Sequence, residues 1–112
     1  MQQALHALIP PPLPDKIFTE GQYAGEYFGE IVNGKMHGQG KMLFTSSENK
    51  GDVYIGAFKN DKMAGWGKYT WGDGRVYVGN LEENEFEGFG TLTYADRGVY
   101  VGEWKGGVRE GG

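Results

Sequence analysis

Two patterns in this sequence have the residue types and spacings that ligand binding or catalysis could require. Gly-x-Gly sequences recur at 38–40, 65–67 and 88–90, and glycine-rich loops can cradle phosphate groups. Carboxylates gather in segment 82–87 (EENEFE), and a pair of carboxylates can perform general acid–base catalysis when different environments separate their pKa values. Each pattern therefore has to be weighed as a candidate site before any structural role is assigned to it.

Neither pattern has the context that its chemistry needs. The Gly-x-Gly sequences precede predicted strands, whereas a dinucleotide-binding fingerprint opens a helix, and the phosphate-loop pattern G-x-x-x-x-G-K-[ST] is absent. The carboxylates lie on one polar connector, which we interpret as a solvated loop or as a contact for a basic partner. His6 and His37 are the two histidines and cysteine is absent, which does not make a zinc site. We predict no catalytic activity, no cofactor and no metal.

Composition divides the chain of 112 residues into two parts. All four prolines lie in the first 14 residues, while all 21 glycines follow from Gly21 onward. We therefore predict an irregular, proline-rich leader over 1–20 and a glycine-rich domain over 21–112. The run 11–14 favours polyproline II, and the leader is expected to dock on its own domain or on a neighbouring chain. As an alternative, Pro11-x-x-Pro14-x-Lys16 fits an SH3-ligand pattern. The formal net charge of −4 argues against nucleic-acid binding.

The glycine-rich domain contains an internal repeat. Tyr-x-Gly-x-apolar occurs four times, with tyrosines separated by 27, 23 and 23 residues, and a glycine pair follows the first three tyrosines after eleven and thirteen residues. The predicted repeats span 27–53, 54–76 and 77–99, with a partial repeat at 100–112. The residues assigned to structural repeat positions are Tyr27, Gly29, Gly38, Gly40, Tyr54, Gly56, Gly65, Gly67, Tyr77, Gly79, Gly88, Gly90, Tyr100, Gly102 and Trp104.

Each repeat reads as two strands in a hairpin, because apolar residues alternate with polar ones after the tyrosine and again after the glycine pair. A pitch of 23 residues leaves no room for a crossover helix. The fold class is therefore all-β: an elongated, twisted, single-layer antiparallel sheet. Such a sheet has no second layer to cover its apolar face, so aromatic rings must lie flat on that face. Glycine provides the space that a flat ring needs.

These residues resemble the MORN repeat family, whose pattern runs Tyr-x-Gly-Glu-Trp/Phe followed by a connector ending in His-Gly-x-Gly. Segments 100–107 (YVGEWKGG) and 34–40 (GKMHGQG) are close to this pattern. Ala57 and Asn80 replace its glutamate, and Ala64 and Glu87 replace its histidine. The resemblance implies stacked β-hairpins that serve as a protein-interaction scaffold, often in cytoskeletal, ciliary or membrane-associated assemblies.

A second apolar stripe lies at the opposite parity of the strands, where a sheet with one buried face should be polar. It could form contacts between adjacent hairpins or a groove for a partner helix or extended segment. We expect connector tips to add further apolar residues, each nine positions after its tyrosine. The candidate partner-binding residues are Phe28, Ile55, Trp66, Val78, Phe89 and Val101 on the strands, and Met36, Met63 and Phe86 at the tips.

The fourth repeat reaches only the glycine pair at its end, so we expect no second strand after Val99–Lys105. An unpaired strand is an open sheet edge, which self-association or strand addition by another chain would cover.

The leading functional hypothesis is a non-enzymatic adaptor in a cytoskeletal assembly, with a ciliary or axonemal one as the specific case. Protein is the expected partner, and the cytoplasm and cytoskeleton are the expected location. The alternative is a membrane-proximal module that binds lipid or tethers a protein. Its support is weaker, because eleven basic residues are spread along the chain and fifteen acidic residues outnumber them.

Overall fold

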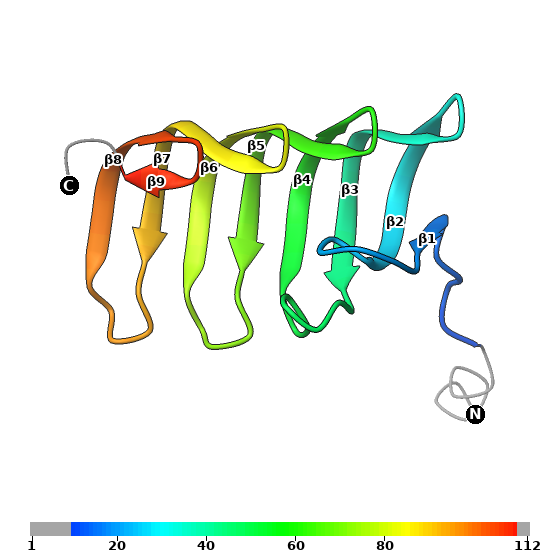
Figure 1. Cartoon of the computed structure of the whole chain (residues 1–112), viewed down its shortest axis with the longest axis horizontal. Helices are drawn as coiled ribbons and strands as arrows, with labels where there is room; N and C mark the ends of the chain where they lie inside the picture. The colour runs from blue at the N-terminus through cyan, green and yellow to red at the C-terminus, as the bar shows by residue number, and fades with distance from the viewer. Residues whose placement is uncertain (1–9, 110–112) are drawn as a thin grey trace, which may run out of the picture.

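The computed structural model describes residues 10–109, which form one antiparallel sheet of nine strands (Figure 1). Each strand pairs with its sequence neighbours, so the sheet is a series of consecutive hairpins, as predicted. Nothing helical within these residues is long and apolar enough to cross a membrane. The strands are β1 (Lys16–Phe18), β2 (Gly25–Val32), β3 (Lys35–Phe44), β4 (Val53–Lys59), β5 (Lys62–Thr70), β6 (Val76–Glu82), β7 (Glu85–Thr93), β8 (Val99–Lys105) and β9 (Val108–Arg109).

A row of glycines crosses the middle of the sheet. Strand register places these residues side by side on β2 to β8: Gly29, Gly40, Gly56, Gly67, Gly79, Gly90 and Gly102. The ring of Tyr54 lies over Gly67, where an added Cβ would be well under 3.0 Å from the ring atoms. Its hydroxyl then reaches the carbonyl oxygen of Ala57 and donates a hydrogen bond of 2.9 Å. The glycines therefore make room for rings that run along their own strands.

A bulge follows the glycine row in each of the first three hairpins. Between β4 and β5, Gly56 pairs with Gly67 and Phe58 pairs with Met63, so Ala57 lies opposite three residues. Gly65, at the centre of these three, has a φ of 97°, in the left-handed region that favours glycine. Because a bulge bends its strand, the far end of each hairpin folds over (Figure 1).

The folded ends, which we call the hairpin tips, hold one repeat to the next. Both residues of each tip turn have positive φ, at 33–34, 60–61, 83–84 and 106–107. Asp61 donates its amide to the carbonyl of Met36 at 3.1 Å and accepts the Met36 amide on its carboxylate at 2.8 Å. Asn84 makes the same two hydrogen bonds, at 3.1 and 2.8 Å, with Met63. The second tip residue is thus an inter-repeat clamp.

Asp61 also forms an ion pair with Lys16 of β1, with the ammonium 2.9 Å from the carboxylate. Burial opposes ionisation of Asp61, but the hydrogen bonds from Met36 and Lys16 outweigh it and lower the pKa of this carboxyl below 3.8. A carboxyl whose pKa is lowered by folding stabilises the fold at pH values above its ordinary pKa. That stability is lost as the pH falls through the folded-state pKa.

We expect Asp61→Asn to lower the free energy of unfolding by about 1 kcal/mol at pH 7, because an amide keeps the Met36 bond but loses the ion pair. The difference from the natural protein should shrink towards zero as the pH falls through the folded-state pKa of Asp61, where Asp61 itself becomes neutral. Urea titrations at pH 7 and at an acid pH where the carboxyl is protonated measure it. Asp73→Asn is the matched control, since the Asp73–Arg75 pair is more exposed and local. An equal loss at both pH values would show that charge is not involved.

The core lies in the angle between the strands and the hairpin tips. Aromatic contacts run through it, including Tyr77 stacked on Phe86 at 3.9 Å and Tyr27 edge-on to Phe58 at 4.9 Å. One sheet can bury a core because each hairpin supplies both arms of that angle. The buried cluster comprises Tyr27, Met36, Met42, Phe44, Tyr54, Phe58, Met63, Tyr69, Tyr77, Leu81, Leu92 and Trp104.

Both ends of the sheet differ from the prediction. The leader is not irregular throughout, because 16–18 form β1 on the edge of β2, where Phe18 packs against the core. The prediction of no strand after β8 is wrong, since Val108 and Arg109 return over a two-glycine turn and pair with Lys105 and Trp104. Residues 1–9 of the predicted leader and 110–112 of the last repeat lie outside the described residues.

Candidate functional site

We call the face opposite the core the back face; its side chains form three rows across the strands. The middle row is Phe28, Lys41, Ile55, Lys68, Val78, Thr91 and Val101. The row away from the tips is Glu26, Leu43, Val53, Thr70, Val76, Thr93 and Val99. The row beside the tips includes Gln39, Ala57, Trp66, Asn80, Phe89 and Glu103.

The six strand residues predicted to bind a partner all lie on the back face, but their stripe is interrupted. Phe28, Ile55, Val78 and Val101 share the middle row, in which Lys41, Lys68 and Thr91 alternate with them. The sequence reasoning missed these three, which come from the second strand of each repeat. Their position directly after the glycine pair was the available signal. The back face is therefore a mixed surface of apolar and cationic side chains.

The tip residues among the predicted partner-binding set are placed differently. Met36 and Met63 are each only 3% exposed, and Phe86 is half-buried between Tyr77 and Trp104. The prediction that places them at connector tips as partner-binding residues is wrong, because they lie in β3, β5 and β7 with their side chains in or against the core. The bulge turns each hairpin end over the core, so a residue that a straight strand would expose lies against the rings. These three residues belong to the core and leave the candidate surface.

The exposed aromatic side chains of the back face lie in the row beside the tips. The side chains of Trp66 and Phe89 are 61% and 59% exposed, and neither forms a hydrogen bond or ring contact with a described residue. The other aromatic residues in 10–109 are buried or half-buried. Ile55 and Val101 in the middle row are 53% and 64% exposed. At the first repeat, Pro11 and Pro12 of the leader line a shallow pocket together with Phe28, Lys41 and Leu43.

The titratable groups of the core have structural roles. Burial raises the pKa values of Tyr54 and Tyr69, and burial with the charge of Glu87 raises that of Tyr77 to about 12. Their hydroxyls therefore stay protonated at neutral pH and keep donating hydrogen bonds. Tyr69 donates to the buried carboxylate of Asp52 at 2.6 Å, which also accepts the amide of Gly72 at 2.9 Å. The sequence reasoning missed Asp52, as it missed the clamps at Asp61 and Asn84.

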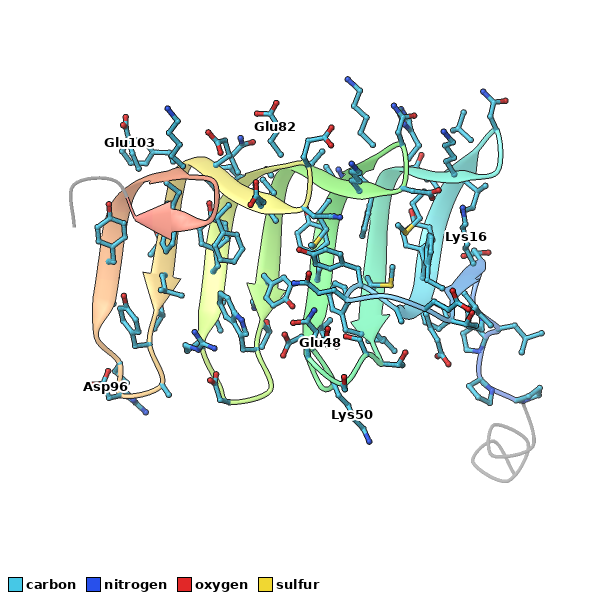
Figure 2. The ribbon with its side chains drawn as sticks, viewed as in Figure 1. Lys16, Glu48, Lys50, Glu82, Asp96 and Glu103 are labelled. Atoms are coloured by element: carbon cyan, nitrogen blue, oxygen red, sulfur yellow. The ribbon has the colours of Figure 1, made fainter. Side chains whose placement is uncertain are left out.

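The carboxylate cluster at 82–87 makes structural contacts. Glu83 pairs with Lys62 of the preceding repeat at 2.6 Å, and Glu87 accepts the amide of Gly106 at 2.8 Å. Glu82 and Glu103 lie toward the side of the sheet that carries the hairpin tips, whereas Lys50 and Asp96 lie at the opposite ends of the strands (Figure 2). Within 10–109 no three His, Asp or Glu side chains are grouped as a metal site would require. The second histidine, His6, lies outside the described residues.

A cavity of about 40 Å³ lies under the segment that joins β1 to β2, between Tyr23, Phe44 and Met63. It has room for one or two water molecules. This end of the core face is closed by Tyr23, whose ring lies 6.2 Å from that of Phe44, and by Ser46, which donates to the carbonyl of Gln22 at 2.6 Å.

Comparison with known proteins agrees with the repeated geometry. The family model for the MORN repeat matches residues 27–48, 54–74, 77–99 and 100–111, which is most of the chain. No curated protein matches it. MORN repeats are generally modules for interaction with proteins or membranes. The four matches begin at the four tyrosines that open the structural repeats and cover most of the chain, so the chain belongs to the MORN repeat family.

Proposed function

We propose that this chain is a non-enzymatic scaffold that holds a partner protein within a cytoskeletal assembly. The observation that carries the proposal is the exposure of Trp66 and Phe89 on one face of a sheet whose other aromatic side chains are buried or half-buried. Large exposed aromatic side chains in a mixed apolar and polar setting are typical of protein interfaces. The geometry supplies a long, rigid surface on which such an interface can form.

The proposed location is the cytoplasm, with a ciliary or axonemal assembly as the specific case. This part rests on the associations of the MORN repeat family and on no contact in the structure. Localisation of a tagged full-length chain in ciliated cells tests it. Enrichment along the axoneme supports the specific case, and a diffuse signal that detergent extraction removes counts against any cytoskeletal attachment.

The scaffold role predicts that Trp66→Ser/Phe89→Ser lowers capture of the partner about tenfold while the protein stays folded. Both side chains are exposed, so their loss should change the melting temperature by no more than about 3 °C. Affinity capture with quantitative mass spectrometry compares the variant with the natural chain. Ile31→Ser/Val32→Ser is the matched control, because it removes exposed apolar surface at the first tip. Equal capture by all three proteins would remove the back face from the proposal.

Membrane binding is the other role open to the family, and vesicles separate it from protein binding. Sedimentation with vesicles rich in phosphatidylserine at low salt should leave this chain in the supernatant, because acidic residues outnumber basic ones. Strong co-sedimentation that salt reverses would replace the scaffold proposal with a membrane-proximal one.

A further inference from the structure

The back face already holds one short proline-rich segment, which belongs to the chain itself. Pro11 and Pro12, which are exposed, line one shallow pocket of the first repeat together with Phe28, Lys41 and Leu43. The acidic residue that ends this segment is fixed as well. Asp15 donates its amide to the carbonyl of Tyr27 at 2.7 Å, and its carboxylate accepts the amide of Gly29 at 2.9 Å. A proline-rich segment of the chain therefore lies beside this surface, and the acid that follows it is held by backbone groups at the edge of β2.

The apolar and cationic side chains of this pocket have counterparts in the second repeat, whereas the amide that holds Asp15 does not, because β4 is paired on both sides. Phe28 pairs with Lys41 across β2 and β3, and Ile55 pairs with Lys68 in the same way across β4 and β5. Ile55 is 53% exposed, and no proline-rich segment of the described chain lies on it. The third repeat offers Val78 in the same place. Pro11 and Pro12 thus lie at the first of several similar positions.

The spacing of these positions matches a polyproline II helix. Equivalent residues of adjacent repeats are two strands apart, which is about 9.6 Å at a strand spacing of about 4.8 Å. Polyproline II has three residues per turn and rises about 3.1 Å per residue, so one turn covers about 9.3 Å. A polyproline II segment that crosses the strands therefore presents every third residue to an equivalent position. Two turns of an α-helix rise about 10.8 Å and match this spacing less closely.

Charge on the back face selects among proline-rich segments. Lys41 and Lys68 are exposed, two strands apart, and form no ion pair with a described residue. Of the back-face carboxylates, Glu30 accepts the amide of Gln39, while Glu26 and Glu103 lie near opposite ends of the sheet. Acidic residues at every third position of a bound segment would face the two lysines.

The exposed aromatic side chains complete the surface. Trp66 on β5 and Phe89 on β7 are again two strands apart, so they match one polyproline II turn. Aromatic rings pack well on proline rings, and the indole N–H of Trp66, which has no partner among the described residues, can donate to a carbonyl of the segment. These two residues lie beside the middle row and widen it toward the tips.

We propose that the back face binds an extended, proline-rich segment of a partner protein, with acidic residues at every third position, running across the strands. The proposal rests on the proposed function as a protein scaffold and names its surface and the chemistry of its partner. A second copy of the chain is the competing occupant, and it would bring the same two lysines to the interface.

Calorimetry with the full chain and a twelve-residue peptide of four Pro-Pro-Glu units tests the proposal. Calorimetry should give one peptide per chain. In NMR spectra, the methyl resonances of Ile55, Val78 and Val101 should shift, while those of the buried Met36 and Met63 should not. A peptide of four Gly-Ser-Glu units has the same charge without the polyproline II conformation and should bind about tenfold more weakly. Equal binding of the two peptides would overturn the proposal, since charge alone would then explain it.

Lys41→Glu/Lys68→Glu should weaken binding of the Pro-Pro-Glu peptide about tenfold. Lys50→Glu/Lys105→Glu is the matched control, with the same change of charge at exposed positions outside the three rows, and should bind as the natural chain does. Equal loss in both variants would overturn the role of the two lysines. Ultracentrifugation tests the competing occupant: a dimer that Trp66→Ser/Phe89→Ser dissociates would overturn the peptide proposal. If those substitutions abolish partner capture but the peptide fails to bind, the scaffold role stands and this inference falls.

Discussion

Gly79→Ala should lower the free energy of unfolding by about 3 kcal/mol and the melting temperature by about 15 °C. The new Cβ would lie 2.6 Å from the carbonyl oxygen of Phe89 and 2.8 Å from the hydroxyl of Tyr77, and closer still to the Cα of Gly90. The nearest atoms belong to the paired backbone, which cannot move aside as a flexible side chain can. The methyl group must therefore separate β6 from β7 or displace the ring of Tyr77.

Gly72→Ala is the control for this experiment, because its Cβ would meet nothing closer than 3.6 Å and its φ is not in the left-handed region. We expect its stability to remain within about 0.5 kcal/mol of the natural protein. Thermal and urea unfolding followed by circular dichroism measure both variants. A Gly79→Ala protein as stable as Gly72→Ala would refute the view that the glycine row allows the rings and the paired strands to pack closely.

Phe86→Ala and Phe89→Ala should have opposite consequences although three positions separate them. The ring of Phe86 lies 3.9 Å from that of Tyr77 and 5.4 Å from that of Trp104, so its loss leaves a cavity in the core. We expect Phe86→Ala to cost about 3 kcal/mol of stability. Phe89 is 59% exposed, so Phe89→Ala should change stability by less than about 0.5 kcal/mol.

Urea unfolding of the two alanine variants under identical conditions provides the comparison, and each serves as the control for the other. Peptide binding should show the reverse order. Phe89→Ala should weaken binding of the Pro-Pro-Glu peptide, whereas Phe86→Ala should bind the peptide normally under conditions where this variant is folded. Similar stability losses in the two variants would contradict the assignment of Phe86 to the core and of Phe89 to the surface.

Most of the sheet could be predicted because its signals are local. The tyrosine at the start of each repeat and the glycines two, eleven and thirteen residues later set the strands, the hairpins and the core face. The turn at 73–74 follows from Asp-Gly alone. Asp61 and Asn84 were harder to identify, since each sits where a glycine would be the easier choice for a positive φ. Their side chains are required by the neighbouring repeat, and that relation is not visible within one hairpin.

Part of the candidate surface could also be predicted, because strand alternation is a local signal. Strand parity correctly separates Trp66 and Phe89 from the core, because a strand alternates its faces whatever surrounds it. Parity would also place Met36, Met63 and Phe86 on the core face, since Met42, Tyr69 and Leu92 follow six positions later on the same strands. Their assignment to connector tips is what fails, because the strands extend past the bulge. Gly38, Gly65 and Gly88 were recognised as repeat positions, but a sequence pattern does not state the φ that turns a glycine into a bend.

The amino-acid sequence by itself determined the repeat, the strand pairs and the row of glycines under the tyrosine rings, since these depend on residues close together in the chain. Only the tertiary structure decided that the hairpin ends fold over the core and that Lys41 and Lys68 stand between the apolar residues of the back face. It also decided that residues 11–18 of the leader lie beside the first repeat. The physical reason is that these features depend on contacts between repeats, whose geometry the backbone sets by bending at the bulges.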